Sequence, residues 1–172
     1  MYIHTSHGKM KNKNHLLYSQ LRITDRQSLR EIIPLKMPFS LFIEPTNLCN
    51  FRCVMCPLSS PDYRKIVGYS GHLGMDLYTK IISDIKKMGK LKSLKLYCDG
   101  ESLLNKNIAK MVRLAKINDI AERIEITTNA SLLKKEISAD LIESELDYLR
   151  ISIASVSERR RFEINQSKIS VR

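Results

Sequence analysis

Three cysteines in the segment NLCNFRCVMCP, Cys49, Cys53 and Cys56, have the type and spacing that could hold a metal centre. Thiolates are soft ligands that bind iron-sulfur clusters or zinc, and three on one short loop can surround a single compact centre. If a 4Fe-4S cluster binds, three irons take the three cysteines and the fourth iron is left open for a ligand that is not protein. An open coordination position is typical of a catalytic rather than a structural centre.

The alternative is a structural zinc site in which Cys98 supplies the fourth thiolate, because Cys98 ends a neighbouring predicted strand. Structural zinc sites usually combine closely spaced pairs of cysteines, whereas this sequence has one group of three. The spacing therefore favours a cluster over zinc. For Cys98 itself we expect a buried strand cysteine, a common position for this residue type.

The chain around these cysteines alternates between strand and helix patterns. Short apolar runs predict strands over residues 39–45, 91–98, 122–129 and 147–154, and apolar residues at helical spacing predict helices over residues 75–90, 106–118 and 134–146. In the first of these helices the predicted buried face consists of Leu77, Ile81, Ile82, Ile85 and Met88. Strands that alternate with helices of this length imply right-handed parallel crossovers. The sequence therefore predicts an α/β fold with about four parallel strands and helices outside the sheet.

The unusual local sequences all follow predicted strands. The cysteine loop follows the first strand, Cys98-Asp99-Gly100-Glu101-Ser102 follows the second, Thr127-Thr128-Asn129-Ala130 closes the third, and Ser152 lies near the end of the fourth. In parallel α/β folds the reactive groups collect at the C-terminal ends of the strands. We therefore expect these segments to meet at one edge of the sheet.

The segment CNFRCVMC, placed directly after a strand, resembles the cysteine signature of the radical S-adenosylmethionine superfamily. The resemblance implies that the three cysteines hold a 4Fe-4S cluster whose open iron is chelated by the amino and carboxylate groups of S-adenosylmethionine. One electron then cleaves this cofactor into methionine and a 5'-deoxyadenosyl radical, which abstracts hydrogen from a substrate. The substrate itself is not indicated by any residue.

The segment YCDGESLLN is similar to the Gly-Gly-Glu-Pro motif of that superfamily, with Gly100 and Glu101 in place, Asp99 where a first Gly is common and Ser102 where Pro is common. The resemblance implies that these residues bind the cofactor. A carboxylate such as Glu101 can accept hydrogen bonds from an ammonium group, and Gly100 allows close backbone approach. The ordinary alternatives are a helix N-terminal carboxylate for Glu101 and a helix cap for Ser102.

Three further cofactor contacts follow from the resemblance. ITTNA resembles the Thr-Asn-Gly strand end of the superfamily and RISIA its serine-bearing fourth strand, so Asn129 and Ser152 are expected at the ribose or the methionine carboxylate. Met55, which precedes the third cysteine, is expected near the adenine. The alternatives are a turn cap for Asn129, a polar strand end for Ser152 and core packing for Met55.

The resemblance covers about residues 39–170, whereas enzymes of this superfamily usually build a partial barrel of six βα units. We therefore expect residues 1–36 to form a basic N-terminal lead with an amphipathic helix over residues 16–33, and residues 37–172 to form a truncated radical SAM core, an incomplete (βα) partial TIM-type barrel. The tail is expected to begin a further helix and a fifth strand. Two hypotheses follow: an enzyme active alone, by self-association or with a partner that completes the barrel, or a degenerate cluster-binding fragment or interaction module without catalysis.

Composition bounds the partners of the protein. The chain has 172 residues with 29 Lys and Arg against 18 Asp and Glu, a net charge of +11. These charges are scattered and are not interleaved with aromatic residues, which favours a solvated basic surface over nucleic-acid binding and leaves an anionic small molecule or an acidic partner as alternatives. No apolar run is long enough to span a membrane, so we expect a cytoplasmic protein. The resemblance adds a reductant protein such as a flavodoxin or ferredoxin.

Overall fold

The computed structural model describes residues 28–166 of the chain. In chain order the elements are α1 (Leu29–Ile32), β1 (Ser40–Phe42), η3 (Pro57–Ser59), α2 (Tyr63–Val67), α3 (Met75–Met88), β2 (Ser93–Lys95), η4 (Ser102–Leu104), α4 (Ile108–Ile117), β3 (Ile124–Thr128), α5 (Lys135–Glu143), β4 (Tyr148–Ile151) and α6 (Glu158–Asn165). The predicted lead helix over residues 16–33 lies largely outside the described residues, and its described end is the short α1. The predicted approach to a fifth strand also lies outside them.

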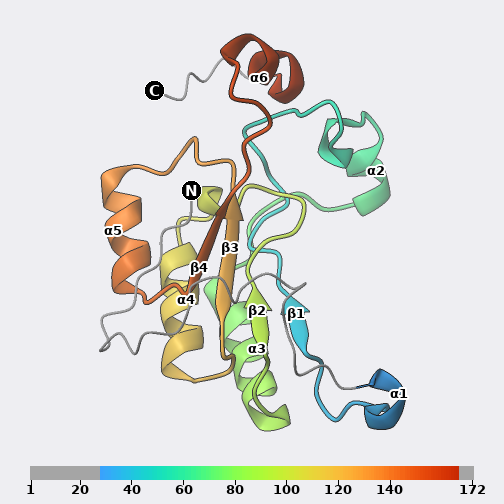
Figure 1. Cartoon of the computed structure of the whole chain (residues 1–172), viewed down its shortest axis with the longest axis vertical. Helices are drawn as coiled ribbons and strands as arrows, with labels where there is room; N and C mark the ends of the chain where they lie inside the picture. Colours follow the sequence, from blue (N-terminus) through green and yellow to red (C-terminus); the bar gives the residue numbers. More distant parts are fainter. Residues whose placement is uncertain (1–27, 167–172) are drawn as a thin grey trace.

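Four parallel strands form one sheet in the order β1-β2-β3-β4, and helices α3, α4 and α5 lie along one face of it (Figure 1). Strands that follow one another in sequence order, with all crossover helices on the same side, have the winding of a (βα) barrel rather than that of a doubly wound sheet. This arrangement confirms the predicted α/β class and the partial TIM-type barrel.

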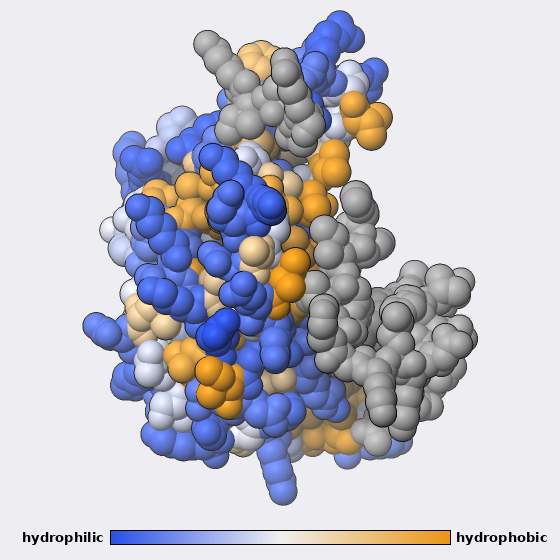
Figure 2. Space-filling view, turned by 90° about the vertical axis from the view of Figure 1, so that its left-hand side faces the viewer, coloured by the Kyte–Doolittle hydropathy of each residue, from blue (hydrophilic) through white to orange (hydrophobic). Residues whose placement is uncertain are grey.

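The hydrophobic core lies between the helices and the sheet face that they cover. Alternate strand residues point toward the helices, and they are joined by one face of each helix. The members from the strands and the residues directly after them are Ile43, Leu94, Leu96, Ile124, Ile126 and Leu149, and the helix members are Tyr78, Ile82, Ile85, Ile108, Met111, Val112, Ala115 and Leu141. The outward side of the molecule near α5 is mostly hydrophilic, with scattered apolar residues (Figure 2).

The buried face of α3 differs from the prediction at two positions. Leu77 is 55% exposed and Met88 is 61% exposed, whereas Tyr78 is fully buried. The Tyr78 hydroxyl donates a hydrogen bond of 3.0 Å to the Met111 carbonyl oxygen in α4. A buried tyrosine needs such a partner for its polar end, and a pattern of aliphatic residues alone does not include it. The prediction of Leu77 and Met88 as core residues was wrong for this reason.

No helix within residues 28–166 is both long enough and apolar enough to cross a bilayer.

Replacing Ile82 by alanine tests the observed face of α3. Ile82 is 2% exposed, so Ile82→Ala is expected to lower the free energy of unfolding by about 2 to 5 kcal/mol through lost burial and a residual cavity. The matched variant Leu77→Ala, in the same helix, is expected to change it by only about 0.5 kcal/mol. Urea unfolding measures both values. Equal losses for the two variants would contradict the observed orientation of α3.

Candidate metal centre

The segment that leads from β1 to the cysteines is fixed by hydrogen bonds to residues 69–73. The Thr46 hydroxyl donates to the Gly71 carbonyl oxygen over 2.8 Å, and the Asn47 amide donates to the Tyr69 carbonyl oxygen over 2.8 Å. In return, the backbone N–H of Gly71 donates to the Asn47 side-chain oxygen. Both Thr46 and Asn47 are buried. The approach to the cysteine loop is therefore held at a defined position, although it has no regular secondary structure.

Gly100 lies directly against the backbone of this segment. A Cβ atom at Gly100 would fall 1.9 Å from the Thr46 carbonyl oxygen and 2.8 Å from the Leu48 carbonyl oxygen. No side chain fits at those distances, so the close approach that only glycine permits is used by the chain itself. Gly100 thereby sets how near the loop after β2 can come to the cysteine loop.

Glu101 ties three strand ends together from a buried position, with 3% of its surface exposed. Its backbone N–H donates to the Leu48 carbonyl oxygen over 2.8 Å. Its Oε1 accepts from the Thr128 hydroxyl at 2.6 Å and from the Leu103 N–H at 3.1 Å, and its Oε2 accepts from the Asn129 N–H at 2.7 Å. Glu101 therefore caps η4, as its ordinary alternative stated, and also joins the loop after β2 to the end of β3.

Ser102 has a different role from a helix cap. It is the first residue of η4, the cap position belongs to Glu101, and the Ser102 hydroxyl donates to the Leu96 carbonyl oxygen over 2.9 Å. Ser102 is 1% exposed. The ordinary alternative for Ser102, a helix cap, was wrong, because the Glu101 carboxylate accepts from the N–H of Leu103.

The three cysteines of the loop are all half-buried and unpaired. The backbone N–H of Phe51 donates to the Cys49 sulfur at 3.4 Å, and the Asn129 amide nitrogen lies 3.9 Å from the same sulfur. The Cys53 thiol is 3.5 Å from the Asn165 side-chain oxygen. Polar groups around a ligand sulfur orient it and adjust its charge when metal binds.

Burial raises the pKa of the Cys49 and Cys53 thiols, and the neighbouring Glu101 and Cys56 add to the effect at Cys49. At neutral pH these two thiols are therefore protonated in the chain without metal. Metal binding must displace their protons, because thiolate is the form that coordinates.

The spacing of the sulfurs distinguishes between the two kinds of metal centre. In a tetrahedral zinc site the sulfurs lie about 3.8 Å apart, which follows from a Zn–S distance of about 2.3 Å. Within residues 28–166, the only three candidate ligand atoms that all lie within 4.8 Å of one another belong to Glu44, Cys98 and Asp99. The three loop sulfurs do not all lie within that distance of one another, so the metal-free loop does not hold them at the spacing of one zinc ion. This donor set fits a cluster better than a single ion.

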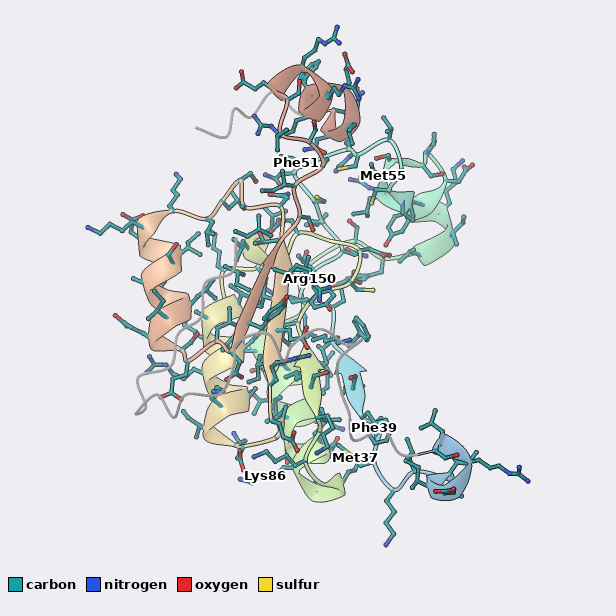
Figure 3. All side chains as sticks on the ribbon, viewed as in Figure 1. Met37, Phe39, Phe51, Met55, Lys86 and Arg150 are labelled. Atoms are coloured by element: carbon teal, nitrogen blue, oxygen red, sulfur yellow. The ribbon has the colours of Figure 1, made fainter. Side chains whose placement is uncertain are left out.

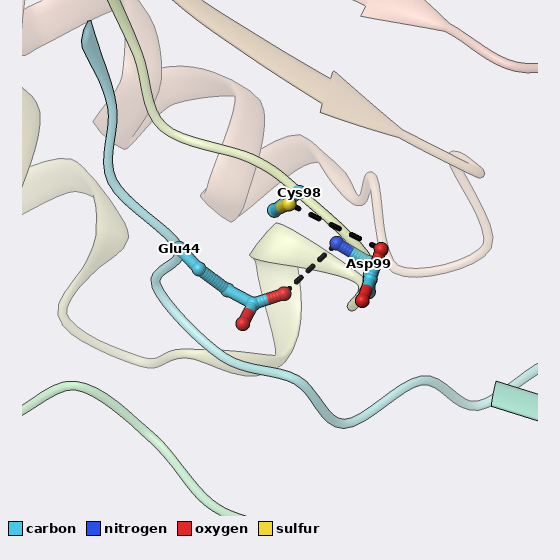
Figure 4. A group of neighbouring side chains, drawn as sticks. All are labelled: Glu44, Cys98 and Asp99. Atoms are coloured by element: carbon cyan, nitrogen blue, oxygen red, sulfur yellow. Dashed lines mark hydrogen bonds between the residues drawn. The ribbon is translucent and has the colours of Figure 1, made fainter. Parts of the chain in front are cut away.

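Cys98 is exposed and lies beside Glu44 and Asp99 (Figure 4). Strand β2 ends at Lys95, so Cys98 belongs to the following loop and not to the strand. The expectation of a buried strand cysteine was wrong, because the predicted strand over residues 91–98 extended too far. Glu44 accepts hydrogen bonds from the N–H groups of Asp99 at 2.8 Å and Gly100 at 3.4 Å, and so shapes this loop.

Helix α6 contributes a contact that sequence reasoning missed. The Asn165 carbonyl oxygen accepts from the Arg52 N–H at 3.0 Å, and the Ile164 carbonyl oxygen accepts from the Val54 N–H at 2.9 Å. The end of α6 therefore lies along the cysteine loop, at the top of Figure 1. Asn165 is 6% exposed. The sequence carries no signal for this contact, because the burial of Asn165 depends on how α6 packs.

The remaining predicted cofactor residues lie at the same edge of the sheet but in different surroundings. Asn129 is half-buried, and its amide donates to the Asn50 side-chain oxygen at 2.9 Å. Ser152 is exposed just beyond β4, with its N–H bonded to the Thr128 carbonyl oxygen. Met55 is 68% exposed, on the loop near α2 (Figure 3), so its alternative of core packing was wrong. The convergence of the four strand ends, predicted from topology, is observed.

Comparison with known proteins decides the family. The family model described as the Radical SAM superfamily matches residues 43–172. The chain belongs to the radical SAM superfamily. Among curated relatives it is 31% identical to a tungsten-containing aldehyde ferredoxin oxidoreductase cofactor-modifying protein of Pyrococcus furiosus, over 66% of this chain and 30% of that protein. It is 30% identical to a GTP 3',8-cyclase of Staphylococcus epidermidis, over 75% of this chain and 38% of that protein.

Among solved structures this radical SAM chain is similar to BtrN in complex with AdoMet and 2-DOIA. The TM-score is 0.61 at 22% identity, over 73% of this chain and 50% of that one, a likeness of fold. The chain spans 30% and 38% of the lengths of the two curated relatives. Membership of the superfamily implies a 4Fe-4S cluster and S-adenosylmethionine as cofactors.

Replacing Gly100 by alanine tests the backbone contact on which the radical SAM site rests. The added Cβ would overlap the Thr46 carbonyl oxygen, so Gly100→Ala is expected to lower the free energy of unfolding by about 3 kcal/mol or more. Gly74→Ala is the matched control, because no atom lies within 4 Å of a Cβ there, and it is expected to cost less than about 1 kcal/mol. Urea unfolding measures both. A Gly100→Ala variant as stable as Gly74→Ala would contradict the contact.

Proposed function

We propose that this chain binds a 4Fe-4S cluster through Cys49, Cys53 and Cys56 and binds S-adenosylmethionine beside it, as part of a radical enzyme. When bound, these groups supply reductive cleavage to a 5'-deoxyadenosyl radical, which abstracts hydrogen from a substrate. The observation that carries the proposal is the cysteine loop itself. It presents three half-buried thiols, not held at the spacing of one zinc ion, at the edge where four parallel strands end.

The residues around the thiols suit a cluster that must accept an electron. The Phe51 N–H points at the Cys49 sulfur, and the Asn129 amide lies beside it. Hydrogen bonds to ligand sulfurs stabilise the added negative charge of a reduced cluster and raise its reduction potential. Asn165 lies beside Cys53 and accepts from its thiol through the side-chain oxygen, so it positions this sulfur.

The proposed cofactor contacts come from Met55, Gly100, Glu101, Ser102, Asn129 and Ser152. Glu101 keeps some capacity for the cofactor: a carboxylate has about four acceptor positions, and the chain uses three. One position on Oε2 can accept from the ammonium group of the methionine moiety. Ser102 and Gly100 support the site by fixing the loop, since the Ser102 hydroxyl is already donated to Leu96. Ser152 and Met55 are exposed and therefore accessible to a ligand.

We propose two partners for this activity. The first is a reductant such as a flavodoxin or ferredoxin, because cofactor cleavage consumes one electron. The second is the remainder of a barrel. Within the described part of the chain, β4 pairs only with β3, so its other edge can accept another strand from the same protein, a second copy or a partner. A cytoplasmic location fits the use of free thiols as metal ligands.

Anaerobic reconstitution with iron and sulfide tests the proposal. The chain is expected to develop the broad absorption near about 400 nm typical of 4Fe-4S clusters and, after reduction with S-adenosylmethionine, to release 5'-deoxyadenosine. Cys53→Ala is expected to lose the cluster, because one iron loses its ligand. Cys98→Ala is the matched control and is expected to keep it, since Cys98 lies with Glu44 and Asp99.

Two results would contradict the assignment. A full 4Fe-4S spectrum in Cys53→Ala would remove Cys53 from the ligand set. Stoichiometric zinc without any cluster in the unaltered chain would replace the cluster by a structural site. A cluster without 5'-deoxyadenosine would support the second hypothesis from the sequence, a cluster-binding fragment without catalysis.

A further inference from the structure

The face of the sheet that turns away from the helices carries polar and aromatic residues in register. Phe42 pairs with Lys95, Lys95 with Glu125 and Glu125 with Tyr148, so these four residues form one row across all four strands. None of them belongs to the hydrophobic core. A parallel sheet is usually apolar on both faces, because both are buried. The polar inner face is therefore a departure that calls for a function.

Lys95 occupies the middle of this row on β2. It is half-buried, and its ammonium lies 4.6 Å from the centre of the Phe42 ring. Within residues 28–166 no carboxylate lies within ion-pair distance of it, although Glu125 is its register partner on β3. By contrast, lysines such as Lys80 and Lys92 are exposed and form ion pairs. The Lys95 charge is therefore left without a carboxylate partner among the described residues, and an anionic ligand could pair with it.

Glu125 does not balance the charge of Lys95, because its carboxylate already contacts two arginines. Its Oε1 accepts from Arg123 at 2.6 Å and 2.9 Å, and its Oε2 lies 4.0 Å from Arg150. Glu125 is 1% exposed, whereas the Arg150 side chain is 49% exposed. Two arginines therefore share this carboxylate, and Lys95 is not within ion-pair distance of it. The Arg150 guanidinium, labelled in Figure 3, has five N–H donors, more than its contact with Glu125 uses.

Thr127 adds a hydroxyl without a partner to the same face. It lies two residues beyond Glu125 on β3, so the strand alternation places both on one side, and it is in register with Arg150. Its Oγ1 is buried and has no hydrogen-bond partner among the described residues. Buried hydroxyls without a partner are uncommon in folded proteins, and a ligand atom is one explanation for this one.

Aromatic rings border this group. Phe42 and Tyr97 meet edge to face with ring centres 5.5 Å apart, and the guanidinium groups of Arg123 and Arg150 each lie 5.7 Å from the Tyr148 ring. Lys95 and Arg150 lie on strands that flank β3, about 10 Å apart, so their side chains can reach one anionic group from two sides.

We propose that the inner face of the sheet binds an anionic substrate, whose phosphate or carboxylate group is held by Lys95 and Arg150 with the Thr127 hydroxyl. The proposal rests on the proposed function, because it places this substrate on the face next to the cysteine loop, within the same barrel. It names the substrate by its charge and deepens that function. The basic composition of the chain alone does not show it, since a net charge does not say which residues share a face of the sheet.

Calorimetric titration of the full chain tests the proposal at about 0.15 M salt, where non-specific attraction is screened. The probes are sodium pyrophosphate and sodium citrate. The probe that binds with the higher affinity shows whether the site prefers a phosphate or a carboxylate ligand. We expect saturable 1:1 binding of at least one probe. Lys95→Met is expected to weaken it by about 10-fold or more, and Arg150→Gln similarly, because each loses a charge-assisted contact.

The matched control is Lys110→Met, which removes the same charge from an exposed position on α4. It is expected to change the affinity by less than about two-fold. Lys95→Arg keeps the charge and is expected to retain binding, which separates loss of the anion site from loss of the fold. Absence of 1:1 binding for both probes, or equal weakening by Lys95→Met and Lys110→Met, would overturn the proposal.

Two further measurements separate this proposal from the proposed function. Cluster content and S-adenosylmethionine binding are expected to be unchanged in Lys95→Met, so their failure in the unaltered chain would count against the proposed function alone. Pyrophosphate or citrate binding is expected to persist with saturating S-adenosylmethionine. Competition between them would overturn the anion site, because Lys95 would then hold the carboxylate of the cofactor instead.

Discussion

The contact between Gly100 and the backbone at Thr46 and Leu48 is the constraint on which the site depends. It brings the loop after β2 against the chain that leads into the cysteines, at a distance that no other residue allows. Glu101 then extends the junction to Thr128 and Asn129 at the end of β3. Three strand ends are therefore held as one unit, and the position of the cysteines is set by backbone packing before any metal binds.

The two faces of the sheet differ in polarity and in role. The face under the helices is aliphatic and supplies stability, which leaves the other face free to carry charge. Lys95, Glu125 and Arg150 could not lie there in a doubly wound sheet, because helices would bury them on both sides. A barrel keeps an interior that can stay polar. The proposed chemistry at the cysteine loop and the proposed anion site are thus adjacent parts of one interior.

The sequence was sufficient for features that depend on local pattern. The sequence pattern predicted the alternation of strands and helices. Because parallel strands all end at the same edge of the sheet, it also predicted that the cysteine loop, Gly100, Glu101 and Asn129 lie together there. Features that depend on packing were not predicted. Leu77 and Tyr78 are neighbours in one helix, and only tertiary contacts decide which is buried. The exposure of Cys98 could be predicted only from the true end of β2. The lack of a carboxylate partner for Lys95 among the described residues, and the contact of Asn165 with Cys53, depend on strand register and on distances that the sequence does not contain.

The central claim is that three loop cysteines hold a cluster with one iron open to S-adenosylmethionine. Electron paramagnetic resonance of the reduced, reconstituted chain, with and without S-adenosylmethionine, tests it most directly, because a ligand on the open iron changes the spectrum of the whole cluster. We expect a 4Fe-4S signal that shifts when the cofactor is added. A 4Fe-4S signal that is identical in both samples would contradict it, since the fourth iron would then already be closed by the protein or inaccessible to the cofactor.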